Sequence, residues 1–279
     1  MSFRIAMDSA GEFTKEMTDP DVYVIVPLTL SIGGVDYTDD GTIPQKLLVE
    51  KIAESPTCPR TACPSPDAFY RAFDCSADHI YGVTISAELS GSYQSAIMAQ
   101  NMYLEEHPGA KIHVFNSRST SCAETIIVKM ITEMEEAGHS FEDICTAVEA
   151  YCIRKHTFFV LDNLETLRKN GRLSRIKALA AAVLKIKPIC AGTENGEIIQ
   201  VDQARGSNKA LMKMVDQVVE KTVHPETRVL GITYVNCRER AIMVRDAILA
   251  RIKVREVILQ EAGGLSSTYA NDGGIIVVI

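Results

Sequence analysis

Short apolar runs typical of β-strands alternate with segments of helical spacing in the first half of this chain. Such alternation favours a mostly parallel sheet covered by helices, because parallel neighbours are joined by crossover connections. Ligands of such sheets gather at the carboxyl ends of the strands, where the segments Asp8-Ser9, 86–92 and 116–119 are expected. The predicted strands are residues 4–7, 23–30, 80–85 and 111–115, and the predicted helices are residues 44–54, 67–73, 90–106, 120–137 and 141–152.

The second half of the chain predicts a mixed sheet with helices. Asn195-Gly196 is a strong signal for a tight hairpin, and the apolar run 274–279 indicates a central strand. A boundary near Lys155 divides the chain into an N-terminal α/β domain, residues 1–155, and a C-terminal α/β domain, residues 156–279. The other predicted strands are residues 158–161, 228–233 and 254–259, and the predicted helices are residues 174–184, 208–221 and 238–252.

Composition limits the possible partners and the compartment. The 279 residues are 46% hydrophobic, which is ample for sizeable cores. A net charge of −7 argues against a nucleic-acid or anionic-membrane surface, since both demand clustered positive charge. The chain starts without a basic leader and apolar core, and its most apolar helical stretch, residues 178–184, is too short to cross a bilayer. We therefore expect a cytoplasmic protein without stable membrane insertion, whose eight cysteines are reduced.

The segment 86–96, Ser-Ala-Glu-Leu-Ser-Gly-Ser-Tyr-Gln-Ser-Ala, lies between a predicted strand and a predicted helix. Backbone N–H groups at a helix start lack partners, so hydroxyl residues around a glycine at this point can hold a carboxylate or a phosphate. A second hydroxyl-bearing segment, Thr61-Ala-Cys-Pro-Ser-Pro66, precedes another predicted helix. The two segments together predict a binding site for one small acidic group. This site needs no lysine or arginine.

A series of short motifs, spread along nearly the whole chain, connects it to a known family. In their order and spacing these motifs resemble the DegV family of bacterial lipid-binding proteins. They are Asp8-Ser9, Val26-Pro-Leu28, Tyr37-Thr-Asp39, the segment 61–65, Leu89-Ser-Gly-Ser-Tyr-Gln-Ser95, Asn116-Ser117, Leu164-Glu-Thr-Leu-Arg-Lys-Asn-Gly-Arg172, Lys187-Pro-Ile189, Asn195-Gly196 and Arg205-Gly206.

The resemblance implies a fold and a function. Family members have two α/β domains and bury a long-chain fatty acid in a tunnel between them, with loop hydroxyls on its carboxylate. They are non-catalytic binding subunits that present this carboxylate to a separate ATP-dependent fatty-acid kinase subunit, which makes an acyl phosphate. The ligand is thus a fatty acid, and no further cofactor is implied.

On this resemblance, Thr61 and Ser90 are the expected ligands of the carboxylate. For an arbitrary Ser or Thr before a helix, capping alone is the more common role. Gly91 is expected to allow close backbone approach and to donate its N–H group. Ser65 and Ser92 are weaker candidates, and Ser65 has the following helix as something to cap.

Four further residues lie in family motifs. Asp8 and Ser9 are candidates beside the ligand, with a turn closed by an Asx-type hydrogen bond as an equally good explanation. Arg172 and Arg205 are expected to contact the kinase or its nucleotide, with a solvated surface position as the alternative.

The C-terminal segment departs from the family pattern. Many members have a histidine followed by Gly-Pro-Gly before the last strand, whereas this chain has Thr-Tyr-Ala-Asn-Asp-Gly-Gly at residues 268–274. Ala270 occupies the histidine position. The head-group network therefore lacks one donor, and Tyr269 and Asn271 are the candidates to replace it.

Two other functions stay open from the sequence. The seat can be an oxyanion or phosphate pocket of a hydrolase or phosphotransferase that acts alone, but no histidine in the matched motifs supplies a base. The bound lipid can also be a signal in a regulatory protein. The six histidines show no metal-binding spacing, and the chain has no Walker loop, dinucleotide fingerprint or nucleophile elbow.

Overall fold

The computed structural model describes residues 2–12, 14–173 and 186–279, and the predicted helix at residues 174–184 lies outside them. Within the described residues the strands form a four-stranded, a six-stranded and a three-stranded sheet. The strands are β1 (Phe3–Asp8), β2 (Tyr23–Val26), β3 (Thr29–Ile32), β4 (Val35–Thr38), β5 (Arg60–Ala62), β6 (His79–Thr84), β7 (Lys111–Asn116), β8 (Thr157–Val160), β9 (Ile186–Gly192), β10 (Ile198–Arg205), β11 (Val229–Tyr234), β12 (Glu256–Glu261) and β13 (Ile275–Val278). The helices are α1 (Gln45–Glu54), α2 (Pro66–Phe73), α3 (Ser92–Glu106), α4 (Cys122–Glu136), α5 (Phe141–Arg154), α6 (Glu165–Lys169), α7 (Ser207–Lys221), α8 (Arg238–Leu249) and α9 (Gly264–Ala270), with a short 3-10 turn at Pro225–Thr227.

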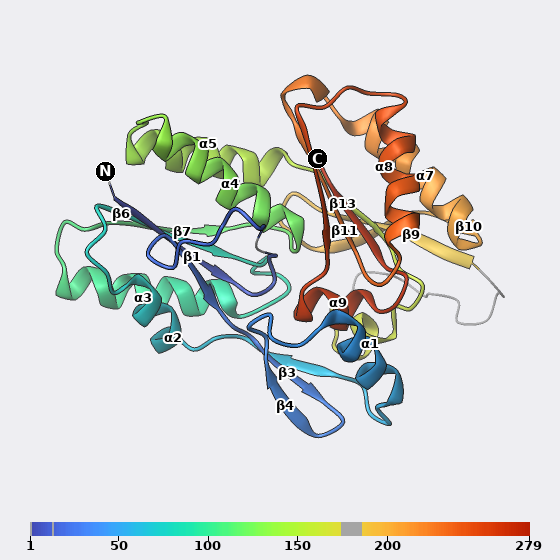
Figure 1. Cartoon of the computed structure of the whole chain (residues 1–279), viewed down its shortest axis with the longest axis horizontal. Helices are drawn as coiled ribbons and strands as arrows, with labels where there is room; N and C mark the ends of the chain where they lie inside the picture. The colour runs from blue at the N-terminus through green and yellow to red at the C-terminus, as the bar shows by residue number, and fades with distance from the viewer. Residues whose placement is uncertain (1, 13, 174–185) are drawn as a thin grey trace.

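The four-stranded sheet is parallel throughout, in the order β2-β1-β6-β7. Helices α4 and α5 cover one face and α2 and α3 cover the other (Figure 1). The alternation of side chains along β1 explains both layers, because successive residues of a strand point to opposite faces. Ile5 and Met7 join the core under α4 and α5, whereas Ala6 joins the core under α2 and α3. The parallel sheet flanked by helices that the sequence predicted is thus confirmed.

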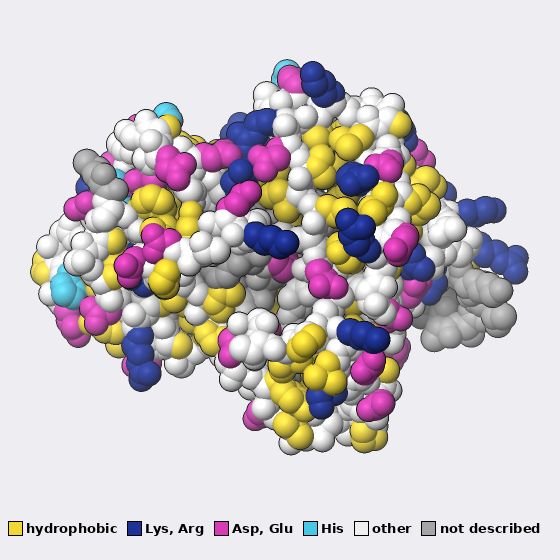
Figure 2. Space-filling model, in the orientation of Figure 1, with side chains coloured by type: hydrophobic (Ala, Val, Ile, Leu, Met, Phe, Trp, Pro, Cys, Tyr) yellow, Lys and Arg dark blue, Asp and Glu magenta, His cyan; other side chains and the backbone are white. Residues whose placement is uncertain are grey.

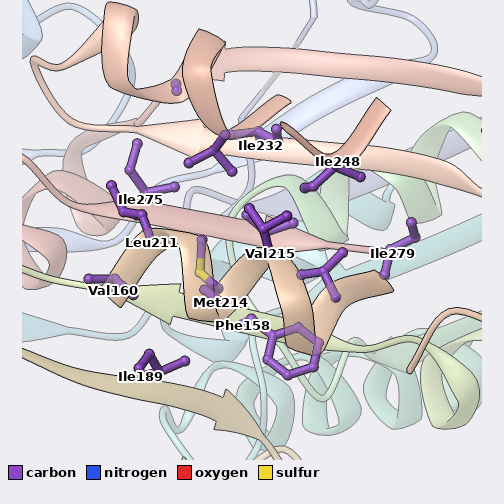
Figure 3. Close-up of a cluster of buried hydrophobic side chains, with 14 of the residues drawn as sticks. Phe158, Val160, Ile189, Leu211, Met214, Val215, Ile232, Ile248, Ile275 and Ile279 are labelled. Atoms are coloured by element: carbon purple, nitrogen blue, oxygen red, sulfur yellow. The ribbon is translucent and has the colours of Figure 1, made fainter. Parts of the chain in front are cut away.

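The six-stranded sheet is mixed, in the order β10-β9-β8-β13-β11-β12, and only β11 and β12 pair in parallel. Strand β13 lies inside the sheet and is buried along its whole length, as its uninterrupted apolar sequence predicts. Figure 3 shows one face, where Phe158, Val160 and Ile275 meet Leu211 and Met214 of α7. The alternate residues, such as Phe159 and Ile276, point to the opposite face and form part of a separate cluster.

The predicted strand at residues 23–30 is wrong in one respect, because it is two strands. Strand β2 ends at Val26, and β3 begins at Thr29 and pairs with β4 and β5 in the three-stranded sheet. Pro27 lies at the break, where it has no N–H group to continue the ladder of β2. The next N–H group, that of Leu28, donates to Ser9 Oγ at 3.0 Å instead. Figure 2 shows the molecular surface notched between the lobe of the parallel sheet and the lobe that carries α1, β3 and β4.

The change from one large sheet to the other falls where the sequence places a domain boundary. Helix α5, which covers the parallel sheet, ends at Arg154, and β8 of the mixed sheet begins at Thr157. The division into residues 1–155 and 156–279 itself stays a prediction.

The β9–β10 hairpin tip joins the two parts of the molecule through Gly196. This glycine has a φ of +90°, and Ser86 Oγ donates to its carbonyl at 2.9 Å. A Cβ atom here would overlap Ser86 Oγ and lie 2.8 Å from the Cα atom of Arg118. Glycine is therefore required both by the backbone conformation and by the close approach.

We expect Gly196→Ala to lower the free energy of unfolding by about 2–4 kcal/mol, from left-handed strain and overpacking together. Gly109→Ala is the matched control, because Gly109 has a φ of +91° but open space around it. Urea unfolding of both variants checks this expectation. Equal losses in the two variants would mean that the close approach of Ser86 and Arg118 adds no cost beyond the left-handed strain.

Candidate ligand-binding site

The loops that follow β1, β6 and β7 meet at one edge of the parallel sheet, as the sequence predicted. Asp8 Oδ2 accepts from the N–H of Ile85 at 3.1 Å, and Asn116 Oδ1 accepts from the N–H of Ala87 at 3.2 Å. The N–H of Ser86 donates to the carbonyl of Ser119 at 2.8 Å. Side chains at strand ends therefore fix the start of the 86–92 loop by direct hydrogen bonds.

A cavity of about 330 Å³ lies between this edge, α9 and the inner face of the mixed sheet. Its volume is in the range of small-molecule sites, about 300–1,000 Å³. Most of the surface of the wall is apolar, so it favours an apolar occupant. The apolar lining residues are Leu28, Ala62, Ile85, Leu89, Phe159, Leu161, Leu167, Ile198, Leu265, Ala270 and Ile276.

Thr61 and Ser90 both line this cavity, together with Gly91. Strand β5 carries Thr61, whose Oγ1 lies 3.0 Å from the hydroxyl oxygen of Tyr269. The end of β5 adjoins the start of α3, because a Cβ atom on Gly91 would lie 3.2 Å from Cys63 Sγ. Gly91 and Cys63 are exposed, so this end of the cavity faces solvent.

The hydroxyl of Ser90 serves the local turn and still has a proton to give. Its Oγ accepts from the N–H of Ser92 at 3.2 Å, just before α3 begins. Its hydroxyl hydrogen has no acceptor among the described residues and can be donated to an anion. Gly91 is the N-cap of α3 and provides no side-chain cap, and the first turn contains no acidic residue. The positive end of this 15-residue helix therefore has no carboxylate in its own first turn, and the nearby acidic group is the buried Asp8 beside Ser92.

Hydroxyl groups deeper in the wall are buried and bonded to one another. Ser121 Oγ lies 2.6 Å from Ser266 Oγ, and Ser119 Oγ lies 2.7 Å from Thr157 Oγ1. Each of the four residues is at least nine-tenths buried. Because these pairs satisfy their own hydrogen bonds, they add less polarity to the wall than their number suggests.

Four of the predicted site residues lie outside the cavity wall. Ser65 caps α2, with its Oγ accepting from the N–H of Ala68 at 3.2 Å. Ser92 and Asp8 are completely buried, and Ser9 Oγ donates to Asp39 at 2.9 Å. The structure gives Ser65 its capping contact and Asp8 its turn contact, because Asp8 Oδ1 accepts from the N–H of Ala10 at 3.1 Å. A role in ligand binding stays a prediction for each of the four.

Two arginines line the cavity, although the sequence predicted a seat without charge. Arg172, which was expected to contact the kinase or its nucleotide, is one of the two. Its guanidinium carbon lies 5.9 Å from the ring centre of Tyr269. Arg118 was not predicted, although it follows the Asn116-Ser117 motif at the end of β7 and that position was the available signal. Its Nη1 donates to the carbonyl of Glu194 at 3.1 Å. Arg205 is exposed on β10 and does not line the apolar cavity.

Helix α9, which the sequence did not predict, brings Tyr269 and Ala270 to the cavity wall. Two buried carboxyl groups hold its first residues. Glu12 Oε1 accepts from the N–H of Gly263 at 3.2 Å, and Asp39 Oδ2 accepts from the N–H of Leu265 at 2.9 Å. Burial raises the pKa of Glu12 to about 7 and that of Asp39 to about 6, because the charged form loses its water.

Of the two replacements considered for the family histidine, Tyr269 reaches the cavity and Asn271 does not. The Tyr269 hydroxyl lies at the Thr61 end, as described above. Asn271 Nδ2 donates to Thr166 Oγ1 and to the carbonyl of Tyr269, each at 3.3 Å. Ala270 is 2% exposed and presents only a methyl group.

Two other kinds of site are absent from residues 2–12, 14–173 and 186–279. No group of three or more His, Cys, Asp or Glu residues in these ranges is placed to hold a metal ion. No helix in them combines the length and the apolar character needed to cross a membrane.

Comparison with known proteins gives a consistent result over the whole chain. The model of the DegV family of uncharacterised proteins matches residues 2–279. A DegV domain-containing protein of Streptococcus pneumoniae is 31% identical over 99% of this chain and 98% of its own length.

Solved structures include similar proteins that contain fatty acids. A DegV family protein from Ruminococcus gnavus with vaccenic acid is 46% identical, with a TM-score of 0.97 and complete coverage of both chains. The Fatty Acid Kinase (Fak) B3 protein of Streptococcus pneumoniae, loaded with linoleic acid, is 30% identical, with a TM-score of 0.91 over 100% of this chain and 99% of that one. The resemblance found in the sequence motifs is thereby confirmed: this chain belongs to the DegV family.

Proposed function

We propose that this chain binds a long-chain fatty acid in the cavity and presents its carboxylate to a separate ATP-dependent fatty-acid kinase. The observation that carries the proposal is a mainly apolar cavity whose solvent-facing end holds Thr61, Ser90 and Gly91. The fatty acids in the structures of similar proteins support the same ligand class. The kinase partner is supported by the likeness to the Fatty Acid Kinase (Fak) B3 protein.

The energies suit a ligand that is held mainly by its tail. Burial of roughly 14 methylene groups at about 0.8 kcal/mol each gives a gross gain of about 11 kcal/mol, before the costs of association. Donors at the head then have to orient the carboxylate and replace the water that it loses. Charge-assisted hydrogen bonds of about 1.5–3 kcal/mol each are sufficient for this.

A hydrolase or phosphotransferase that acts alone receives less support. Such an enzyme needs a base near its nucleophile. No histidine, aspartate or glutamate is among the residues that line the cavity in the described part of the chain. The hydroxyl of Ser90 accepts a backbone hydrogen bond and has no carboxylate or imidazole among its hydrogen-bond partners within the described residues.

The test of the proposal is whether the purified chain contains and exchanges a fatty acid. We expect mass spectrometry of an organic extract to detect about one fatty acid per chain, and delipidated protein to take up added fatty acid. Ala270→Leu is expected to reduce this uptake at least about tenfold, because its larger side chain fills the apolar wall.

Ala53→Leu is the matched control, because Ala53 is exposed on α1 and lines none of the described cavities. Persistent absence of lipid, together with no uptake by the folded protein, would contradict the proposal. Equal uptake by the two variants would place the ligand elsewhere in the molecule.

A further inference from the structure

One wall of the apolar cavity follows β8 and the residue after it. Thr157, Phe159 and Leu161 all line the cavity, because alternate residues of a strand point to the same face. Leu161 belongs to the hydrophobic cluster against which Leu89 packs, and Leu89 precedes Ser90 of the solvent-facing end. Thr157 lies four residues before Leu161, which is about 13 Å along a strand that rises about 3.3 Å per residue. The polar groups around Thr157 therefore face the acyl chain of a bound fatty acid rather than its carboxylate.

Thr157 and Ser119 form a buried hydroxyl pair that has one hydrogen left over. Their side-chain oxygens lie 2.7 Å apart, and the two residues are 8% and 5% exposed. Each hydroxyl group has one hydrogen, and only one of the two hydrogens lies between the oxygens. Neither hydroxyl group donates to another acceptor within the described residues. The second hydrogen of the pair is therefore without an acceptor there, which is uncommon for a buried polar group.

The other hydroxyl pair in the wall has no such remainder. Ser121 Oγ lies 2.6 Å from Ser266 Oγ, and Ser266 Oγ donates to the carbonyl of Ala10 at 3.3 Å. Ser121 then donates to Ser266, so both hydrogens of this pair have acceptors. Thr120 also lines the cavity, and its hydroxyl group makes no hydrogen bond within the described residues. The spare donor and the free hydroxyl group are thus at Ser119, Thr157 and Thr120.

We propose that the cavity takes a fatty acid with a hydroxyl group in the middle part of its chain, and that Ser119 and Thr157 bind this hydroxyl group. The inference rests on the proposed function and specifies its substrate class. A chain made only of methylene groups offers the spare hydrogen no acceptor, whereas the oxygen of a hydroxyl group accepts it. The hydrogen of the ligand's hydroxyl group is donated in turn to Thr120 Oγ1 or to a free lone pair of the Ser119–Thr157 pair. A keto oxygen would make only the first of these bonds.

The experiment compares ligands that differ by one oxygen atom. Isothermal titration of delipidated protein gives the affinities for octadecanoate and for hydroxyoctadecanoates that carry the hydroxyl group on one of the middle carbons, from the ninth to the twelfth. We expect at least one of these to bind the unmodified chain within about threefold of octadecanoate, because its hydroxyl group regains in the wall the hydrogen bonds that it loses from water.

The double variant Ser119→Ala, Thr157→Val removes the hydroxyl pair and nearly keeps the shape of the wall. We expect it to lose at least about tenfold more affinity for that hydroxyoctadecanoate than for octadecanoate, because the ligand's hydroxyl group is then buried without its partners. Ser121→Ala is the matched control, since it removes a hydroxyl group of the same wall that has no hydrogen to spare. It is expected to change both affinities by the same factor.

The outcomes separate this inference from the proposed function. If octadecanoate binds the unmodified chain but every hydroxyoctadecanoate binds at least about tenfold more weakly, the hydroxyl site is refuted and fatty-acid binding stands. This comparison needs no variant to fold. Equal losses for the two ligands in a folded double variant also refute the site, whereas a selective loss that Ser121→Ala does not show supports it. If the folded chain binds none of these ligands, the proposed function fails as well.

Discussion

The double variant Thr61→Val, Ser90→Ala is expected to bind a long-chain fatty acid at least about 100-fold more weakly than the unmodified chain. Each substitution removes a hydroxyl group from the solvent-facing end of the cavity and leaves the apolar wall in place. Two charge-assisted hydrogen bonds at about 1.5–3 kcal/mol each account for this loss. Tyr269→Phe is expected to have a smaller effect, because Thr61 then still donates to the carboxylate.

Titration of delipidated protein with a fluorescent fatty acid measures the effect. Ser65→Ala is the control, since Ser65 caps α2 and does not line the cavity. It is expected to lower the free energy of unfolding by about 1 kcal/mol and to leave the affinity unchanged. Unchanged affinity in a folded double variant would remove Thr61 and Ser90 from the head-group site.

The second large effect concerns stability, which is expected to fall as the pH rises from about 4.5 to about 8. Burial raises the pKa of Glu12 from 4.5 to about 7 and that of Asp39 from 3.8 to about 6. The folded protein therefore binds these two protons more tightly than the unfolded chain does. Their contribution to stability is fully present below the unfolded pKa and is lost as the pH rises through the folded pKa. At about 1.4 kcal/mol per pKa unit, each group accounts for about 3 kcal/mol.

Other groups also contribute to the pH dependence. Burial also raises the pKa of Asp8, and burial together with the Asp8 carboxylate raises that of Glu124 well above its usual value, so both act in the same direction. Half-buried His156 acts in the opposite direction below about pH 6.5, because burial lowers its pKa.

Glu12→Gln isolates the contribution of one carboxyl group to the pH dependence of the unfolding free energy. Its neutral amide does not titrate, so the difference in unfolding free energy between the unmodified chain and the variant should change by about 3 kcal/mol from pH 4.5 to pH 8. Any hydrogen bond that the amide loses to Gly263 or Gln260 shifts this difference equally at every pH. Urea unfolding across the pH range measures it, and Asp39→Asn added to Glu12→Gln should flatten the curve further. A constant difference would show that Glu12 is not titrated in this range.

These carboxyl groups are part of what the sequence could not reveal. Glu12 and Asp39 reach the residues at the start of α9 across more than 220 positions of the chain. Local patterns describe neighbours in the sequence, and a seven-residue helix without a polar cap has a weak local signal. The placement of Tyr269 against Thr61 depends on these distant contacts, and so does the position of Arg172 over the Tyr269 ring.

The sequence by itself determined the parallel sheet, the mixed sheet with its central last strand, the hairpin at Asn195-Gly196, and the family. The sheets and the hairpin follow from the periodicity of apolar residues and from turn chemistry, both of which act over a few residues. The family follows from the order and spacing of motifs that resemble it. The resemblance to the family also pointed to Thr61 and Ser90. Only the tertiary structure decided that these two line one cavity with Arg118 and Arg172. The physical reason is that a cavity wall consists of side chains from segments far apart in the chain, and its charge and volume exist only once those segments pack together.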